Sequence, residues 1–100
     1  VPILALGGKG VISVLSNPMP RATHEICQKF FDGDIAGSRK LQLELLDFVN
    51  ALFCEVNPIP VKAAMAAMGY CDDELRLPLT PMEDAHKEKM LGIMKELGLI

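Results

Sequence analysis

Most of the chain carries apolar residues at the three- and four-residue spacing of amphipathic helices, with polar positions between them. The repeat is clearest in the middle of the chain, where apolar side chains alternate four and three residues apart, at Leu41, Leu45, Phe48 and Leu52. Positions spaced in this way lie on one face of a helix. The pattern predicts a long amphipathic helix, and Asp34 is a suitable N-cap residue for it.

A similar apolar face precedes this helix. It consists of Ala22, Ile26, Cys27, Phe30 and Phe31. Pro20 suits the first turn, because its missing N–H would have no helical partner there, and Gly33 is a typical terminator. We therefore expect a helix whose first turn contains Pro20 and which ends at Gly33.

Two further helices are predicted in the second half of the chain. Asn57 and Pro58 are typical of the N-cap and first position of a helix, which Gly69 would end. Thr80, followed three residues later by Glu83, has the spacing of a capping box and predicts the start of the last helix. We therefore expect the second half of the chain to be helical.

The segment near the start has a different pattern. Val11, Ile12 and Val14 make residues 10–15 a short apolar run rich in β-branched side chains, which predicts a strand buried on both faces. A buried strand needs hydrogen-bond partners, and every later segment predicts helix. We expect this strand to pair with residues outside the sequence or with another copy of the chain. Because the chain also begins with Val1 in the middle of an apolar element, we expect it to be a piece of a longer protein.

Composition narrows the possible classes of function. The 100 residues are 50% apolar, and their net charge of −3 is spread without a basic stripe, which argues against a nucleic-acid partner. The 3 cysteines are far apart and favour neither disulfides nor a zinc site, so a reducing cytoplasm fits best. No apolar stretch approaches the roughly 18 residues of a membrane span. We expect a soluble, cytoplasmic protein that contacts no membrane.

Few side chains suggest chemistry on their own. Lys9 lies among glycines, but a phosphate-binding loop has its strand before the glycines, and here the order is inverted. Lys62 is better placed to form a Schiff base, although a single lysine on an amphipathic helix is more often a surface residue. His24 and His86 lie far apart in the sequence, so no metal site is expected. Most of the methionines are expected on apolar helix faces, in the core or at an interface.

Three motifs, in this order and at suitable separations, resemble the C-terminal third of the dihydrodipicolinate synthase family. They are "GGKGVISVLSN" at 7–17, "FCEVNPIPVKAAM" at 53–65 and "LRLPLTP" at 75–81. The combination of "NPIPVK" with "RLPLTP" is specific for this family, whereas "GxKGVIS" recurs in other pyruvate-dependent aldolases. The resemblance covers essentially the whole chain.

This resemblance implies an α/β fold, the TIM (β/α)8 barrel with an appended C-terminal helical domain. The chain would cover the last strand and helix of the barrel and the appendage, so it would be mostly α-helical. Residues 1–33 would end the barrel, with strand 8 at 10–15 and helix 8 at 18–32, and residues 34–100 would form the helical domain.

The resemblance also implies a lyase that condenses pyruvate with L-aspartate 4-semialdehyde through a Schiff base, in diaminopimelate and lysine biosynthesis. The lysine that forms the Schiff base and the other catalytic residues of the family precede residue 1, so no catalytic residue, metal or cofactor is expected in this chain. One substrate contact is implied, between pyruvate and the main-chain carbonyl of Ile12. Asn57 would lie near the active-site mouth with no assigned role. The family forms homotetramers, as dimers of dimers, with Leu6 near the weaker contact.

Two alternatives remain at this point. The parent protein could be another pyruvate-dependent aldolase, acting on a sialic acid or a keto-deoxy sugar acid. The chain could instead be a stand-alone helical interaction domain, whose edge strand recruits a partner.

Overall fold

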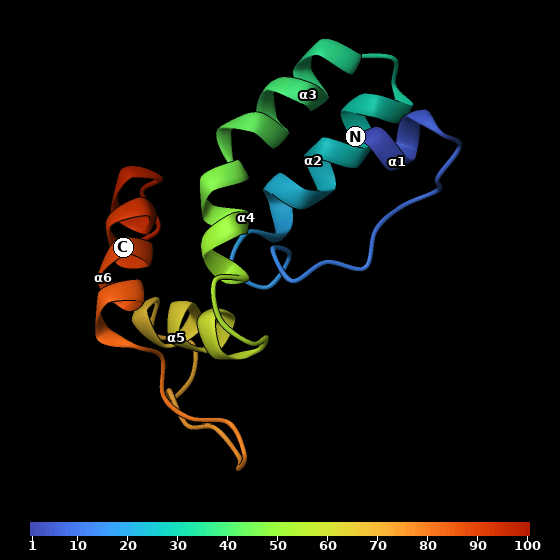
Figure 1. Cartoon of the computed structure of the whole chain (residues 1–100). Coiled ribbons are helices and arrows are strands. Elements are labelled where there is room, and N and C mark those ends of the chain that lie inside the picture. Colours follow the sequence, from blue (N-terminus) through green and yellow to red (C-terminus); the bar gives the residue numbers. More distant parts are fainter. The chain divides into compact units, whose positions relative to one another are not determined.

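The computed structural model describes residues 1–100 and contains helices joined by turns and loops (Figure 1). The helices are α1 (Pro2–Ala5), α2 (Pro20–Phe31), α3 (Ile35–Glu44), α4 (Leu46–Leu52), α5 (Ile59–Ala67) and α6 (Asp84–Glu96). The chain divides into two compact units, Val1–Leu46 and Asp47–Ile100. None of the helices has the length and apolar composition needed to cross a membrane. The expectation of a mostly α-helical chain is confirmed.

In the first unit, α2 packs against α3. Ser38 of α3 is fully buried, and its Oγ donates a hydrogen bond to the main-chain carbonyl of Ile26 in α2, at 2.6 Å. Because a buried hydroxyl without a partner is costly, this bond fixes where α3 crosses α2. The helix expected over residues 18–32 is therefore present as α2, and it is joined to the helix that follows.

The connection between α2 and α3 contains the helix terminator and the N-cap that the sequence predicts. Gly33 adopts a positive φ of 88°, and the N–H of Asp34 returns to the carbonyl of Lys29 at 2.8 Å, which closes the end of α2. Asp34 then caps α3, since its Oδ1 accepts a hydrogen bond from the N–H of Gly37 at 2.9 Å. A Cβ on residue 37 would overlap the Asp34 carboxylate. Glycine at position 37 therefore leaves the space that this cap needs.

The long helix expected after Asp34 is interrupted, and that part of the prediction is wrong. Leu45 separates α3 from α4, and its backbone angles of φ −96° and ψ −1° depart from the helical ψ of about −42°. The apolar stripe is nevertheless buried as expected, with 3% exposure at Leu45 and none at Phe48 and Leu52. The spacing of apolar residues identified the buried face, while a local change in one backbone angle broke the helix.

The strand expected over residues 10–15 does not form within this chain. Residues 8–13 have no regular secondary structure, and residues 15–18 form a turn. The side chains of Val11 and Ile12 are exposed, at 60% and 106%. A strand is stabilised by hydrogen bonds to a neighbouring strand, and no other segment of this chain is extended into one. The assignment of residues 10–15 to a barrel strand stays a prediction about a larger assembly.

In the second unit, α5 packs against α6. Its core combines small and large apolar side chains, including Ala63 and Ala64 of α5 and Met90 and Met94 of α6, with exposures of 1%, 0%, 0% and 0%. Alanines let the two helices approach closely, and methionines fill the irregular space between them. The prediction that methionines belong to the core is confirmed for Met90 and Met94.

Both predicted helix starts in this unit need correction. Pro58, rather than Asn57, is the N-cap of α5, and no side chain caps that helix. The last helix begins at Asp84, with Glu83 in an extended conformation as its N-cap, so Thr80 and Glu83 do not form a capping box. The N–H of Glu83 instead donates to Glu55 at 3.0 Å. A carboxylate from a distant loop has replaced the local cap that the sequence predicted.

Candidate functional site

Ile12, the one substrate contact that the resemblance implies, lies in a loop whose far end is held by side-chain hydrogen bonds. Ser16 Oγ donates to the carbonyl of Ser13 at 2.6 Å, and Asn17 Nδ2 donates to the carbonyl of Val14 at 3.0 Å. These bonds fix the turn that follows Ile12. The carbonyl of Ile12 takes part in none of the hydrogen bonds of the turns and loops. Its oxygen is thus available as an acceptor in this chain.

The other residues singled out from the sequence are not gathered into one site. Lys9 is exposed in the first unit, and Lys62 is partly exposed on α5 in the second. His24 is exposed on α2, and Asn57 is exposed immediately before α5. This arrangement agrees with the interpretation of both lysines as surface residues and gives Asn57 no partner that would assign it a role.

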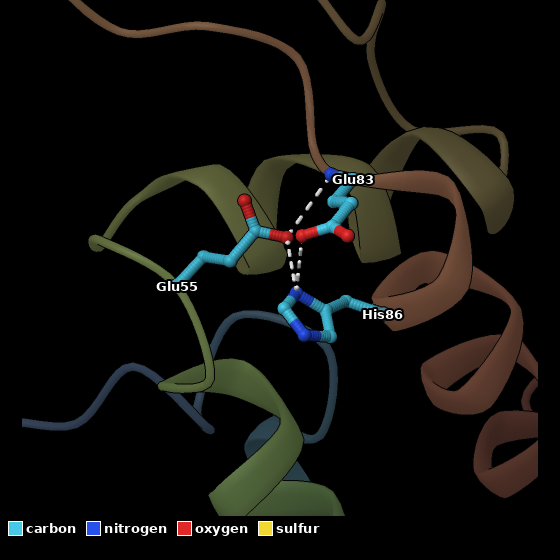
Figure 2. A network of polar contacts seen from close by, with 3 residues as sticks. All are labelled: Glu55, Glu83 and His86. Atoms are coloured by element: carbon cyan, nitrogen blue, oxygen red, sulfur yellow. Dashed lines mark hydrogen bonds and ion pairs between the residues drawn. The ribbon is translucent and has the colours of Figure 1, made fainter.

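The second unit contains a polar cluster that the sequence did not predict. It consists of Glu55, in the loop after α4, with Glu83 and His86 at the start of α6, and we call it the Glu55 cluster (Figure 2). Glu55 Oε2 lies 2.9 Å from His86 Nδ1 and accepts the 3.0 Å hydrogen bond from the Glu83 N–H. The Glu83 carboxylate lies 3.6 Å from the same imidazole nitrogen. One carboxylate oxygen therefore accepts from a backbone N–H and faces an imidazole.

The position of Glu55 follows from the ends of two helices. Helix α4 ends at Leu52, and the loop after it lies at the N-terminus of α6, where Glu55 accepts the hydrogen bond from the Glu83 N–H. The free N–H groups and the dipole of a helix N-terminus favour a carboxylate. The Glu55 side chain is 19% exposed, and that of His86 is 43% exposed, so the pair is partly shielded from water. The N-terminus of α6 thus stabilises the Glu55 carboxylate at a position beside His86.

Cys54 adds a third kind of side chain to this region. A Cys54 sulfur, a Glu55 carboxylate oxygen and a His86 ring nitrogen all lie within 4.8 Å of one another. Thiolate, carboxylate and imidazole are the three side-chain groups that bind zinc in proteins.

A cavity of about 560 Å³ adjoins these residues. It is lined by Asp47, Asn50, Ala51, Cys54, His86, Lys89, Met90 and Ile93. Its wall combines apolar side chains with a thiol, an imidazole and charges of both signs. The cavity gives a small ligand or water access to Cys54 and His86 from the surface.

Sequence reasoning missed this cluster because its members come from two distant segments. Glu55 and His86 are 31 residues apart, and His86 stands in the charged stretch "DAHKEK", which favours a solvent-facing interpretation. The only local signal for a metal or polar site was the adjacent pair Cys54 and Glu55, next to the end of a predicted helix. A pair of residues with these side chains is too common to indicate a site without its third member.

A family model and individual curated proteins that are similar to this chain indicate the same family. The model of the dihydrodipicolinate synthetase family matches residues 1–97. The 4-hydroxy-tetrahydrodipicolinate synthase of Lachnoclostridium phytofermentans is 58% identical over 100 residues, which are 100% of this chain and 34% of that protein. The resemblance inferred from the three motifs is confirmed.

Solved structures show the same relationship. Dihydrodipicolinate synthase from Thermotoga maritima superimposes with a TM-score of 0.97 at 44% identity, covering 99% of this chain and 34% of that one. The chloride-inhibited enzyme from Acinetobacter baumannii, in complex with pyruvate, gives 0.93 at 38% identity, with coverages of 99% and 34%. The chain thus spans about a third of the length of these relatives, and its helical fold is that of the corresponding part of the synthases.

Proposed function

The chain belongs to the dihydrodipicolinate synthetase family, and on that premise we propose that it is the C-terminal third of a 4-hydroxy-tetrahydrodipicolinate synthase. The whole enzyme would condense pyruvate with L-aspartate 4-semialdehyde in the route to diaminopimelate and lysine. The observation that carries the proposal is the 58% identity to a protein of that name over the full chain. The combination of "NPIPVK" with "RLPLTP" favours this enzyme over the sugar-acid aldolases.

In this proposal the chain supplies structure and one substrate contact. Residues 10–15 pair with upstream strands as the last strand of the barrel, α2 covers them as its last helix, and residues 34–100 form the helical appendage. The exposure of Val11 and Ile12 supports this arrangement, because two large β-branched side chains would then become buried. The Ile12 carbonyl faces bound pyruvate, and the catalytic lysine lies upstream.

The chemistry of a Schiff base determines which groups the upstream part of the enzyme must supply and which contact this chain supplies. The reaction needs an amine to condense with the pyruvate carbonyl and groups that move protons at the reacting carbon. By resemblance to the family, the lysine that forms the Schiff base precedes residue 1, and Lys9 and Lys62 match non-catalytic positions. The chain therefore positions pyruvate without providing the nucleophile. The complex of a similar structure with pyruvate supports the choice of that substrate.

The test is to assay the full-length protein and trap its intermediate. We expect turnover with pyruvate and L-aspartate 4-semialdehyde, and borohydride in the presence of pyruvate should inactivate the enzyme by reducing the Schiff base to a stable amine. Peptide mass mapping should place this adduct outside residues 1–100. The 100-residue chain alone should show no turnover.

Three results would contradict the proposal. An adduct on Lys9 or Lys62 would show that this chain carries the nucleophile. Turnover by the isolated chain would do the same. Schiff-base formation with pyruvate but no use of the semialdehyde, together with cleavage of a sialic acid or keto-deoxy sugar acid, would assign the protein to a sister aldolase.

We further propose that the enzyme works in the cytoplasm as a homotetramer assembled as a dimer of dimers. The supporting observation is the exposure of apolar side chains in the first unit, including Leu6 at 89% and Phe31 at 51%. Apolar groups exposed in a part of a protein are commonly covered by the remainder of the chain or by another subunit. The proposal assigns no metal or cofactor to the reaction, and no nucleic acid or membrane to the assembly.

A further inference from the structure

We propose that Cys54, Glu55 and His86 form a binding site for a divalent metal ion of the zinc class. The three ligand atoms lie within 4.8 Å of one another, and they come from the loop after α4 and the first turn of α6. Zinc accepts this combination of thiolate, imidazole and carboxylate, whereas calcium and magnesium prefer oxygen ligands alone. The inference concerns the second unit and does not rest on the proposed synthase activity.

The spacing of the ligand atoms is close to that of a tetrahedral site. With zinc–ligand bonds of ordinary length, neighbouring nitrogen and oxygen ligands are separated by about 3.4 Å, and a sulfur from either by about 3.6 Å. His86 Nδ1 and Glu55 Oε2 are now 2.9 Å apart. The nitrogen and the oxygen need to separate by a fraction of an ångström to bind one ion. The Cys54 sulfur lies within 4.8 Å of the ligand atoms of Glu55 and His86, so a small movement brings it to its bonding distance. Because Cys54 is exposed and His86 is partly exposed, small side-chain rotations suffice.

Metal binding exchanges protons in a defined way. The cation binds at His86 Nδ1, and the neutral imidazole then carries its single proton on Nε2. A proton that occupies Nδ1 before binding moves to Nε2, or to solvent when both ring nitrogens were protonated. The Cys54 thiol loses its proton to solvent when the thiolate binds. The Glu55 carboxylate turns from a hydrogen-bond acceptor into a ligand. No bond to carbon changes, and no electron is transferred.

The fourth coordination position is open to a second carboxylate or to water. Glu83 Oε2 lies 3.6 Å from His86 Nδ1, and Figure 2 shows its carboxylate beside that of Glu55. The adjoining cavity, which Cys54 and His86 line, gives water access to the same place. A bound ion would join the loop after α4 to the N-terminus of α6. The expected effect of the metal is therefore stabilisation of the second unit.

The test uses the full-length protein, reduced and freed of metal by chelation. Cobalt(II) serves as a spectroscopic probe of a zinc site, and we expect a thiolate-to-cobalt charge-transfer band with the visible bands of a tetrahedral ion. Adding zinc should abolish these bands and raise the melting temperature. Replacing a residue that merely orients a metal ligand costs about 10–100-fold in affinity, so Cys54→Ser and His86→Gln should each weaken binding at least about 100-fold.

Matched variants in other parts of the chain serve as controls. Cys71→Ser removes another exposed cysteine, and His24→Gln removes the other histidine. Both should keep the cobalt spectrum and the zinc-dependent rise in melting temperature. Circular dichroism of each metal-free variant separates lost binding from lost folding, and the exposed Cys54 side chain makes Cys54→Ser a conservative change.

Several outcomes would overturn the inference. One is a cobalt complex without a thiolate band, and another is unchanged binding in Cys54→Ser or in a folded His86→Gln protein. Loss of binding in Cys71→Ser or His24→Gln would move the site elsewhere. A cobalt spectrum that depends on Cys54 and His86 but survives Glu55→Gln with unaltered affinity would remove Glu55 from the ligand set and refute the three-residue site.

Discussion

At the scale of single residues, the backbone and the side chain of Ile12 have different expected roles. The side chain is fully exposed in this chain, and the proposed contact with pyruvate is made by the main-chain carbonyl. In the assembled barrel the side chain should matter through packing. The two roles can be separated because a change from isoleucine to valine alters packing and leaves the carbonyl in place.

Ile12→Val in the full-length enzyme tests this separation. Removing one buried methylene should cost about 0.5–1.5 kcal/mol of stability, which a thermal melt would record as a modest fall in melting temperature. The KM for pyruvate should stay near that of the unaltered enzyme. Ile12→Pro, which removes the amide donor of the expected strand, should damage both folding and pyruvate binding.

The opposite pattern would contradict the main-chain assignment. A tenfold higher KM for pyruvate in Ile12→Val corresponds to about 1.4 kcal/mol of binding free energy if KM follows substrate affinity. If that rise occurred with an unchanged melting temperature, the side chain itself would be the contact.

At the scale of elements, the start of α3 depends on one carboxylate oxygen. Asp34 caps the helix at Gly37, and it also lies 3.8 Å from Lys29 in an exposed ion pair. Exposed ion pairs contribute little, whereas a helix cap contributes about 0.5–2 kcal/mol. The cap should therefore account for most of the contribution of Asp34 to stability.

Replacing Asp34 separates the two interactions. Asp34→Ala should lower the free energy of unfolding by about 1 kcal/mol, because the Gly37 N–H loses its acceptor. Asp34→Asn keeps an oxygen for that N–H and removes only the charge, so its loss should be clearly smaller. Chemical denaturation of the three proteins measures both changes. Equal losses in the two variants would show that charge, rather than the cap, carries the effect.

Individual elements also show how far sequence reasoning extends. The cap at Asp34 and the terminator at Gly33 were predictable because their partners lie within a few residues. The contact at the start of α6 was not, since Glu55 precedes the N-cap residue Glu83 by 28 residues and takes the place of the local capping box. The loss of the strand at residues 10–15 has the same origin, because a strand depends on neighbours that no local pattern describes.

The candidate sites follow the same rule. The motif around Ile12 is continuous in sequence, so its resemblance to the family could be recognised directly. The Glu55 cluster unites residues from two segments, and neither segment signals the other. The apolar stripe at Leu45, Phe48 and Leu52 was correctly identified as buried although the helix that carries it is broken. The spacing of apolar residues thus predicted which side chains are buried, whereas the sequence did not predict the polar contacts between distant segments.

At the scale of the whole molecule, the exposed Leu6 provides a test of assembly. In the family the corresponding region is expected to flank the weaker contact between dimers, and Leu6 is 89% exposed in this chain. Leu6→Asp in the full-length protein would place a charge in an apolar contact, where it lacks a partner and is costly to desolvate. Sedimentation velocity should show a shift from tetramer toward dimer. Leu6→Met keeps an apolar side chain and should leave the tetramer intact.

An unchanged tetramer in Leu6→Asp would contradict the placement of Leu6 at that contact. Dissociation to monomers would instead place it at the stronger contact within each dimer. Both results are read from the same sedimentation experiment, so the position of Leu6 in the assembly does not depend on an activity measurement.

The hydrogen bond from the Glu83 N–H to Glu55 has a consequence for the long irregular connection between α5 and α6 (Figure 1). It anchors the end of that connection at α6, while the N–H of Tyr70 bonds the carbonyl of Met65 at its beginning, at 3.1 Å. With both ends held, the entropy of closing the loop depends only logarithmically on its length, and doubling the length costs about 0.6 kcal/mol. The exposed residues 72–74, which precede the family motif at 75–81, can therefore vary in number among homologous proteins while α5 and α6 keep their packing.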